Sequence, residues 1–271
     1  MSACLAVASG KGGVGKSVIT ANLAASIALS GTRVLIIDAD IGLRSQDALL
    51  SLENRVVYDL VDLAEGECLP EQAVLHHETI PSLHLLPAAQ FKRAKFLDPR
   101  RLSDIFRTFQ DSYDYIIVDC PAGIERGLRN VLNAGVDGII VIATPDDISL
   151  RSVERTAMVI DGKKAPRPSL IVNRLDSRLI RSGEMMSPQA VSEVLDLHLL
   201  GAIPEDPAFR HALLRHSLLI NFDCEARSAV LRIASRIQGR NIPIPSFTKK
   251  SSIFRRSARR PLKEVSPLDD Y

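Results

Sequence analysis

The sequence lacks several features that mark particular classes of protein. Its four cysteines form no C-x-x-C pair, and its six histidines show no ligand-like spacing, so we expect no structural zinc. No apolar stretch approaches the ~20 residues that a membrane-spanning helix needs, and the N-terminus does not resemble a signal peptide. We therefore expect reduced core thiols in a protein that is soluble or at most sits on a membrane surface.

Basic charge is scarce outside the C-terminal end of the chain. The formal net charge of the 271 residues is +2. Residues 246–271 contain seven lysines and arginines and three acidic residues, a net charge of +4, which leaves −2 for the rest of the chain. A body with that charge is not, on average, a nucleic-acid-binding surface, whereas the tail is a candidate binding element.

Short apolar runs alternate with helical patterns along the chain. Runs without polar alternation are typical of strands buried on both faces. Their alternation with helices predicts an α/β fold, a mostly parallel sheet with helices on both faces. The predicted strands cover residues 4–8, 34–37, 83–86, 115–118, 138–143, 170–172 and 199–203, and the predicted helices cover 17–30, 100–110, 125–134, 149–160, 188–197, 207–216 and 226–238.

The composition changes after Gly239. The stretch "NIPIPSF" can be neither a helix nor a central strand because of its prolines, and the basic tail follows it. No internal repeat and no low-complexity linker precedes it. We expect one domain over residues 1–240 and a basic, flexible tail over residues 241–271.

The stretch "GKGGVGKS" at residues 10–17 matches the phosphate-binding pattern G-x-x-x-x-G-K-[ST]. It lies between a predicted strand and a predicted helix, so its backbone N–H groups and the positive end of the helix would converge on phosphate oxygens. Lys16 would neutralise the β- and γ-phosphates, and the Ser17 hydroxyl would bind Mg²⁺. The predicted nucleotide-binding residues of this loop are Gly10, Lys11, Gly12, Gly13, Val14, Gly15, Lys16 and Ser17.

Aspartates follow two of the predicted strands. Asp38 and Asp40 come at the end of "VLIIDAD", and Asp119 ends "YIIVD". Open α/β sheets bind ligands outside the carboxyl ends of their strands, so Asp119, which precedes Pro-Ala-Gly, is a candidate to hold Mg²⁺ through water. For Asp38 and Asp40, the spacing leaves a functional role and an ordinary cap or turn equally open.

The pattern Lys-Gly-Gly-Val-Gly-Lys-Ser resembles the deviant Walker A motif of the ParA/MinD family of P-loop ATPases, to which the nitrogenase iron protein also belongs. In that family the early lysine, here Lys11, crosses a dimer interface and touches phosphates held by the other subunit. The resemblance therefore implies a homodimer in which ATP binding and dimerisation are one event. From the residues alone, a merely solvated lysine stays an alternative for Lys11.

Further segments resemble the MinD branch of that family between residues 3 and 243. "DADIGLRSQD" resembles switch I, "DCPAGIE" resembles switch II, and "TPDDISLRSVER", "RSGEMMS" and "GAIPEDP" follow in the same order. The resemblance implies that Asp40 positions the attacking water and that Asp38 lies near the phosphates. It implies ATP and Mg²⁺ as cofactors, with Lys11, Lys16 and Asp40 as catalytic residues and Ser17, Asp38 and Asp119 around the metal.

The same resemblance places the adenine site at the ends of two late strands. It assigns this site to Asn173, whose amide can pair with an adenine edge, and to the backbone near Pro204, Glu205 and Asp206. From the residues alone, Asn173 at a strand end is equally a turn residue.

The chain departs from the MinD pattern in switch I and in the tail. MinD proteins usually read Arg-Asn-Leu-Asp where this chain has Arg44-Ser45-Gln46-Asp47. Ser45 thus lacks an amide that could contact the partner protomer or the nucleotide. We expect this difference to affect the details of the switch and the response to an activator.

MinD proteins end in an amphipathic helix that inserts into the membrane, and the corresponding stretch here is "KKSSIFRRSARRPLKEV". On a helix, Ile253 and Phe254 belong to a narrow apolar stripe flanked by basic residues such as Arg255 and Arg256. Two apolar side chains contribute ~1.5–3 kcal/mol each, and basic residues add ~1 kcal/mol each near anionic lipid. This predicts a conditional anchor that works best with two copies. A solvated tail, or one that binds nucleic acid or a partner protein, stays an alternative.

The leading hypothesis is an ATP-hydrolysing dimerisation switch in the cytoplasm. In its ATP form it would bind the anionic inner face of the cell membrane, or of an organelle of bacterial origin, and recruit a division inhibitor. A topological-specificity activator protein would stimulate hydrolysis and release it. A ParA-like DNA partition ATPase ranks lower because the body is net negative, so nucleic acid is not the expected partner. A MinD-like regulator of flagellar placement is poorly separated from the first hypothesis. Electron transfer is disfavoured because no second cysteine fits Cys120 at cluster spacing.

Overall fold

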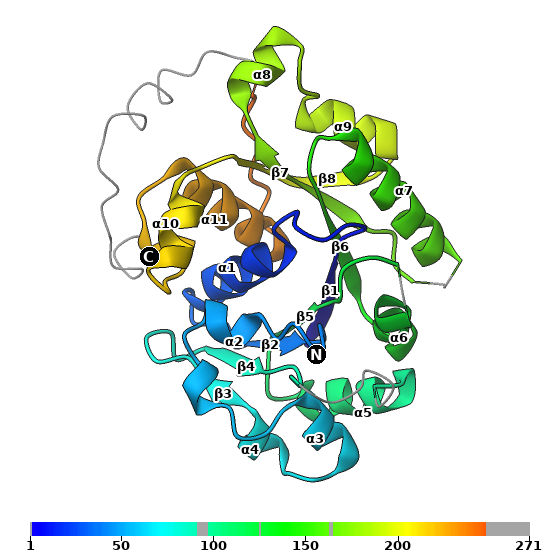
Figure 1. The fold of residues 1–271 in the computed structure, drawn as a ribbon, viewed down its shortest axis with the longest axis vertical. Helices are drawn as coiled ribbons and strands as arrows, with labels where there is room; N and C mark the ends of the chain where they lie inside the picture. The colour runs from blue at the N-terminus through cyan, green and yellow to red at the C-terminus, as the bar shows by residue number, and fades with distance from the viewer. Residues whose placement is uncertain (1, 91–96, 125, 163–164, 248–271) are drawn as a thin grey trace.

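The computed structural model describes residues 2–90, 97–124, 126–162 and 165–247. In this part of the chain an eight-stranded sheet has the order β3-β4-β2-β5-β1-β6-β7-β8 (Figure 1). Neighbouring strands are parallel except for the antiparallel pair β3 and β4. The strands are β1 (Ala3–Ala8), β2 (Val34–Asp38), β3 (Leu75–His76), β4 (Leu83–Leu86), β5 (Tyr115–Asp119), β6 (Gly138–Ala143), β7 (Ser169–Leu175) and β8 (His198–Pro204).

Helices cover both faces of this sheet, as predicted. The helices are α1 (Lys16–Ala28), α2 (Gln46–Leu49), α3 (Leu60–Glu65), α4 (Pro70–Ala73), α5 (Pro99–Phe109), α6 (Arg126–Ala134), α7 (Asp147–Asp161), α8 (Ser177–Ser182), α9 (Pro188–Leu195), α10 (Ala208–Leu214) and α11 (Glu225–Ile237), with short 3₁₀ turns η1 (Glu53–Arg55) and η3 (Leu219–Asn221). Helices α1, α10 and α11 lie on one side, and α5, α6, α7 and α9 lie on the other (Figure 1).

Alternate residues of each strand enter two separate cores, because successive side chains of a strand point to opposite faces. In β2, Leu35 and Ile37 belong to the core beneath α5, α6 and α7, whereas Val34 and Ile36 belong to the core beneath α1 and α11. Every residue of β2 is buried. This burial on both faces explains why the strands are continuous apolar runs in the sequence.

The differences from the predicted elements concern short or irregular segments. The two-residue β3 and the four- to six-residue helices α2, α3, α4 and α8 were not predicted, because periodicity needs longer windows. Strand β7 continues past the predicted end through a register irregularity between Val172 and Leu175. Asn173 is therefore inside an irregular strand, which excludes the alternative that it is a turn residue at the strand end.

The chain changes direction in the sheet beside β1. From β1 it passes outward to β2 and β4, returns to β5, and then crosses to β6 on the other side of β1. The carboxyl end of β1 is therefore a topological switch point, where open α/β sheets bind ligands. The glycine loop leaves β1 at this point and leads directly into α1.

The segment after α11 is neither helix nor strand, as predicted from its prolines. Arg236 donates from Nη1 to the carbonyl of Leu200 in β8 (3.1 Å), and from Nε and Nη2 to the carbonyls of Ile242 (2.7 Å) and Pro243 (2.9 Å). Phe247 is buried, so residues 241–247 pack on the body.

The predicted membrane-contacting residues Ile253, Phe254, Arg255 and Arg256 lie outside the described residues. Within the described residues, no helix combines the length and the apolar character needed to cross a bilayer.

Candidate functional site

Two glycines of the loop meet different steric demands. Gly15 caps α1 with φ 93°, a left-handed conformation that favours glycine, and a Cβ there would lie 2.8 Å from Asn173 Nδ2. A Cβ on Gly10 would lie 2.3 Å from the carbonyl oxygen of Ser152 in α7. The loop is therefore held closely between β7 and α7.

Three of the predicted site residues lie around the buried ammonium group of Lys16. Its Nζ donates to Asp119 Oδ1 at 2.6 Å and to Ser17 Oγ at 3.2 Å, and it lies 3.9 Å from Asp40 Oδ2. Asp119 is fully buried and Lys16 is only 6% exposed. A buried carboxylate needs such a partner because desolvating an unpaired charge is costly. The structure thus brings together the residues predicted for phosphate, metal and water positioning.

Asp38 holds the switch I loop against the end of β2. Its Oδ1 accepts the N–H of Asp40 (3.0 Å), and its Oδ2 accepts the N–H groups of Ser45 (3.1 Å) and Gln46 (3.0 Å). Burial, reinforced by the charge of Asp119, raises the pKa of Asp38 to about 7. These contacts make Asp38 an organiser of the loop, and its predicted role near Mg²⁺ stays a prediction.

Asp40 is slightly exposed, whereas Asp38 is fully buried. Burial raises the pKa of Asp40, and the nearby Lys16 ammonium opposes that rise. A carboxylate with a raised pKa accepts protons more readily than an ordinary one. Its place beside Lys16 suits the predicted task of orienting a water molecule.

Gln46 is a site residue that the sequence analysis did not identify. Its side chain is fully buried, and Nε2 donates to Asp119 Oδ2 (2.7 Å) and to the carbonyl of Ser17 (3.0 Å). It therefore connects switch I with both the phosphate loop and the end of β5. The only signal in the sequence was a polar residue within "RSQD".

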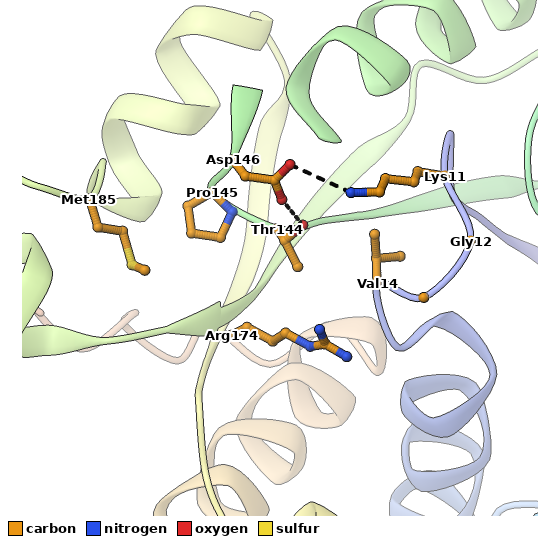
Figure 2. A pocket seen from close by; sticks show the side chains of 9 residues that line it. Lys11, Gly12, Val14, Thr144, Pro145, Asp146, Arg174 and Met185 are labelled. Carbon is orange, nitrogen blue, oxygen red and sulfur yellow. Dashed lines mark hydrogen bonds and ion pairs between the residues drawn. The ribbon is translucent and has the colours of Figure 1, made fainter. Parts of the chain in front are cut away.

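Lys11 has an environment opposite to that of Lys16. Its side chain is 43% exposed, and Nζ lies 3.8 Å from Asp146 Oδ1 (Figure 2). Asp146 also caps α7 by accepting the N–H of Ser149 (2.9 Å). An exposed pair of this kind stabilises by about 0–1 kcal/mol, so Lys11 is readily redirected to another anion.

A pocket of about 250 Å³ opens beside the loop (Figure 2). It is lined by Lys11, Gly12, Gly13, Val14, Thr144, Pro145, Asp146, Arg174 and Met185. Four of these residues belong to the predicted phosphate loop, and the other five were not predicted from the sequence. Thr144 follows β6 directly, so a search for any polar residue after a strand, and not only for aspartate, would have selected it. Arg174 has φ 58°, a strained conformation that non-glycine residues adopt mainly where the surroundings impose it.

The predicted adenine-binding residues make hydrogen bonds to the phosphate loop and around the turn after β8. Asn173 Nδ2 donates to the carbonyl of Val14 at 2.8 Å. Pro204 ends β8, and the Glu205 N–H donates to the carbonyl of Leu175 at 3.0 Å. Asp206 accepts the N–H groups that begin α10 and α11. These four residues are not among those that line the pocket, and their contact with adenine stays a prediction.

The donor set fits a magnesium nucleotide. Ser17 and Asp119, two of the three residues predicted for the metal, offer the hydroxyl and carboxylate oxygens that Mg²⁺ prefers, and both lie within 3.2 Å of Lys16 Nζ. Among the described residues no three His, Cys, Asp or Glu side chains form a group that could hold a metal ion by themselves. Asn173 Oδ1 is buried without a hydrogen-bond partner in the described part of the chain, and an adenine amino group would supply one.

The chain is similar to one family along most of its length. The ParA family model, described as "NUBPL iron-transfer P-loop NTPase", matches residues 1–238. The chain is 39% identical over 262 residues to the septum site-determining protein MinD of Helicobacter pylori, covering 94% of this chain and 97% of that protein. It resembles a chain of the MinC:MinD cell division protein complex of Aquifex aeolicus with a TM-score of 0.82 and 33% identity, covering 90% of this chain and 99% of that one. It resembles the septum site-determining protein MinD complexed with Mg-ADP from Pyrococcus horikoshii with a TM-score of 0.77 and 28% identity, covering 88% and 96%.

Proposed function

Because the chain belongs to the MinD septum-site-determining proteins of the ParA family of P-loop NTPases, we propose that it is a Mg²⁺-dependent ATPase that acts as a dimerisation switch. The observation that carries this proposal is the contrast between the two lysines of one loop. Lys16 is buried against Asp119, whereas Lys11 is exposed and weakly paired. Lys16 would bind the nucleotide of its own subunit, and Lys11 would bind the nucleotide of the partner subunit.

Lys16, Ser17, Asp119 and Asp40 carry the chemistry within one subunit. Ser17 and Asp119 would hold Mg²⁺, which would supply neutralisation of charge on the β- and γ-phosphates. The Lys16 side chain, which now donates to Asp119, would turn to donate to the phosphates, and Asp119 Oδ1 would then be available to accept a hydrogen bond from water at the metal site. Asp40 orients the attacking water by accepting its hydrogen bond, and the raised pKa of Asp40 favours proton acceptance.

Lys11 carries the coupling to dimerisation. Its exposed pair with Asp146 is exchanged for phosphate oxygens of the nucleotide in the partner subunit. A charge-assisted hydrogen bond to phosphate is stronger than an exposed ion pair, so ATP favours the dimer. Hydrolysis and loss of the γ-phosphate reverse that preference.

The partners proposed for the ATP-bound dimer are a division inhibitor, an activator protein and an anionic membrane. The Aquifex aeolicus structure is a MinC:MinD complex, which supports a MinC-like inhibitor as a partner of this chain. The basic tail supports membrane binding, with Ile253 and Phe254 as its apolar contacts and Arg255 and Arg256 as its electrostatic ones.

Co-sedimentation with anionic liposomes tests this function. The full chain is compared with a chain that ends at Phe247, a boundary that keeps this buried residue, and each is spun with Mg²⁺ and either ATP or ADP. ATP-dependent binding that is lost on truncation supports the membrane switch. Absence of binding by both chains removes the membrane role. Salt-sensitive DNA binding by the truncated chain would instead favour a partition ATPase.

A further inference from the structure

Gln46 lies where three parts of the site meet. Its backbone N–H donates to Asp38 Oδ2 at the end of β2 (3.0 Å). Its side-chain Nε2 donates to the carbonyl of Ser17 at the start of α1 (3.0 Å) and to Asp119 Oδ2 at the end of β5 (2.7 Å). One residue thus ties switch I to the phosphate loop and to the predicted metal-binding carboxylate.

The two acceptors fix the orientation of the Gln46 amide. A backbone carbonyl and an ionised carboxylate accept hydrogen bonds and donate none, so only the NH₂ end of the amide can face them. Gln46 Oε1 is buried and receives no hydrogen bond from the described residues. A buried acceptor without a partner is unfavourable, so the two donated bonds must outweigh that cost.

The two carboxylate oxygens of Asp119 have different donors. Lys16 Nζ and Thr20 Oγ1 approach Oδ1 (2.6 and 3.3 Å), whereas Gln46 Nε2 holds Oδ2. With Gln46 in place, Oδ2 has a buried donor and the carboxylate plane is fixed. Without it, Oδ2 would lose this donor and the carboxylate would no longer be fixed in the orientation predicted for Mg²⁺, while Lys16 would keep its contact with Oδ1.

We propose that Gln46 is a positioning residue that fixes the carboxylate of Asp119 for Mg²⁺-dependent nucleotide binding and couples switch I to that event. This inference rests on the proposed nucleotide function. It predicts that loss of the Gln46 amide weakens the contribution of Mg²⁺ to nucleotide affinity while the affinity measured without Mg²⁺ stays nearly constant.

Titration with a fluorescent N-methylanthraniloyl ADP, in excess Mg²⁺ and in EDTA, tests the inference without relying on turnover. Gln46→Met keeps the length and the approximate volume of the side chain and removes both side-chain bonds, and Gln46→Leu is a second apolar variant. Gln110→Met, at the exposed C-terminal end of α5, is the matched control. Urea unfolding curves identify any variant that is not folded.

The measured quantity is the increment, the ratio of the affinity in excess Mg²⁺ to the affinity in EDTA. We expect this ratio to be about tenfold smaller in Gln46→Met than in the wild type, because one hydrogen bond to a charged group contributes free energy of that order. The control should keep the full increment. An unchanged increment in folded Gln46→Met and Gln46→Leu overturns this inference alone, as does an equal loss of affinity with and without Mg²⁺. Absence of nucleotide binding by the wild type overturns the proposed function together with the inference.

Discussion

Replacing Lys16 by methionine removes the ammonium that compensates the buried carboxylate of Asp119. The two groups lie 2.6 Å apart, and Asp119 is fully buried. Methionine retains most of the apolar stem of lysine, so the main change is the loss of charge. Breaking a buried pair by removing one partner lowers the free energy of unfolding by about 3–5 kcal/mol. We expect that loss in Lys16→Met at neutral pH.

Urea unfolding measures this loss directly. With a slope of about 3 kcal/mol per molar urea, 3–5 kcal/mol corresponds to a midpoint lowered by roughly 1–1.7 M. The chain contains no tryptophan, so far-ultraviolet circular dichroism is the appropriate signal.

Lys11→Met is the matched control because it removes a lysine from the same loop at an exposed position. We expect its free energy of unfolding to change by no more than about 0.5 kcal/mol. The double variant Lys16→Met/Asp119→Asn should recover much of the lost stability, because the uncompensated charge is gone. Equal midpoints for Lys16→Met and the wild type, or an equal fall for Lys11→Met, would refute the reasoning.

Three further predictions follow from burial and backbone geometry. The pKa of Asp38 is raised to about 7, so its folded form binds the proton more tightly. Its contribution to the free energy of unfolding should fall as pH rises between about 4 and 7. A plot of the urea midpoint against pH should therefore be flatter for Asp38→Asn than for the wild type over this range, and equal slopes for the two proteins would contradict this. Gly15→Ala should weaken fluorescent-ADP binding at least about tenfold, because φ is 93° and the new Cβ meets Asn173 Nδ2 at 2.8 Å; wild-type affinity would disprove it. Mass spectrometry after brief alkylation should find Cys68, which is half-buried, modified before Cys4, because burial raises the pKa of Cys4 to about 12; equal rates would count against it.

Much of the architecture was predictable because its signals are local. The glycine loop, its strand and its helix are adjacent in the sequence, and β2 and β5 are apolar runs that end in Asp38 and Asp119. The parallel sheet brings those ends together without further information. The predicted convergence of the loop with two strand ends is therefore a consequence of topology.

The remaining features depend on side-chain reach and irregular backbone. The bonds of Gln46 join residues 29 and 73 positions away in sequence, and no local pattern encodes them. Periodicity also does not reveal the register irregularity in β7, where Asn173 lies, or the hydrogen bond from Asn173 to the carbonyl of Val14. The pairing of Lys11 with Asp146 requires the close approach of the loop to α7.

Sedimentation velocity shows whether Lys11 couples ATP binding to dimerisation, as we propose. The wild type and Lys11→Ala are compared with Mg²⁺ and either a non-hydrolysable ATP analogue or ADP, with the 29.6 kDa monomer as reference. We expect the wild type to be a dimer with the analogue and a monomer with ADP, whereas Lys11→Ala should stay monomeric with both and still bind nucleotide. A Lys11→Ala variant that dimerises as readily as the wild type, or a wild type that stays monomeric with the analogue, would contradict this proposal.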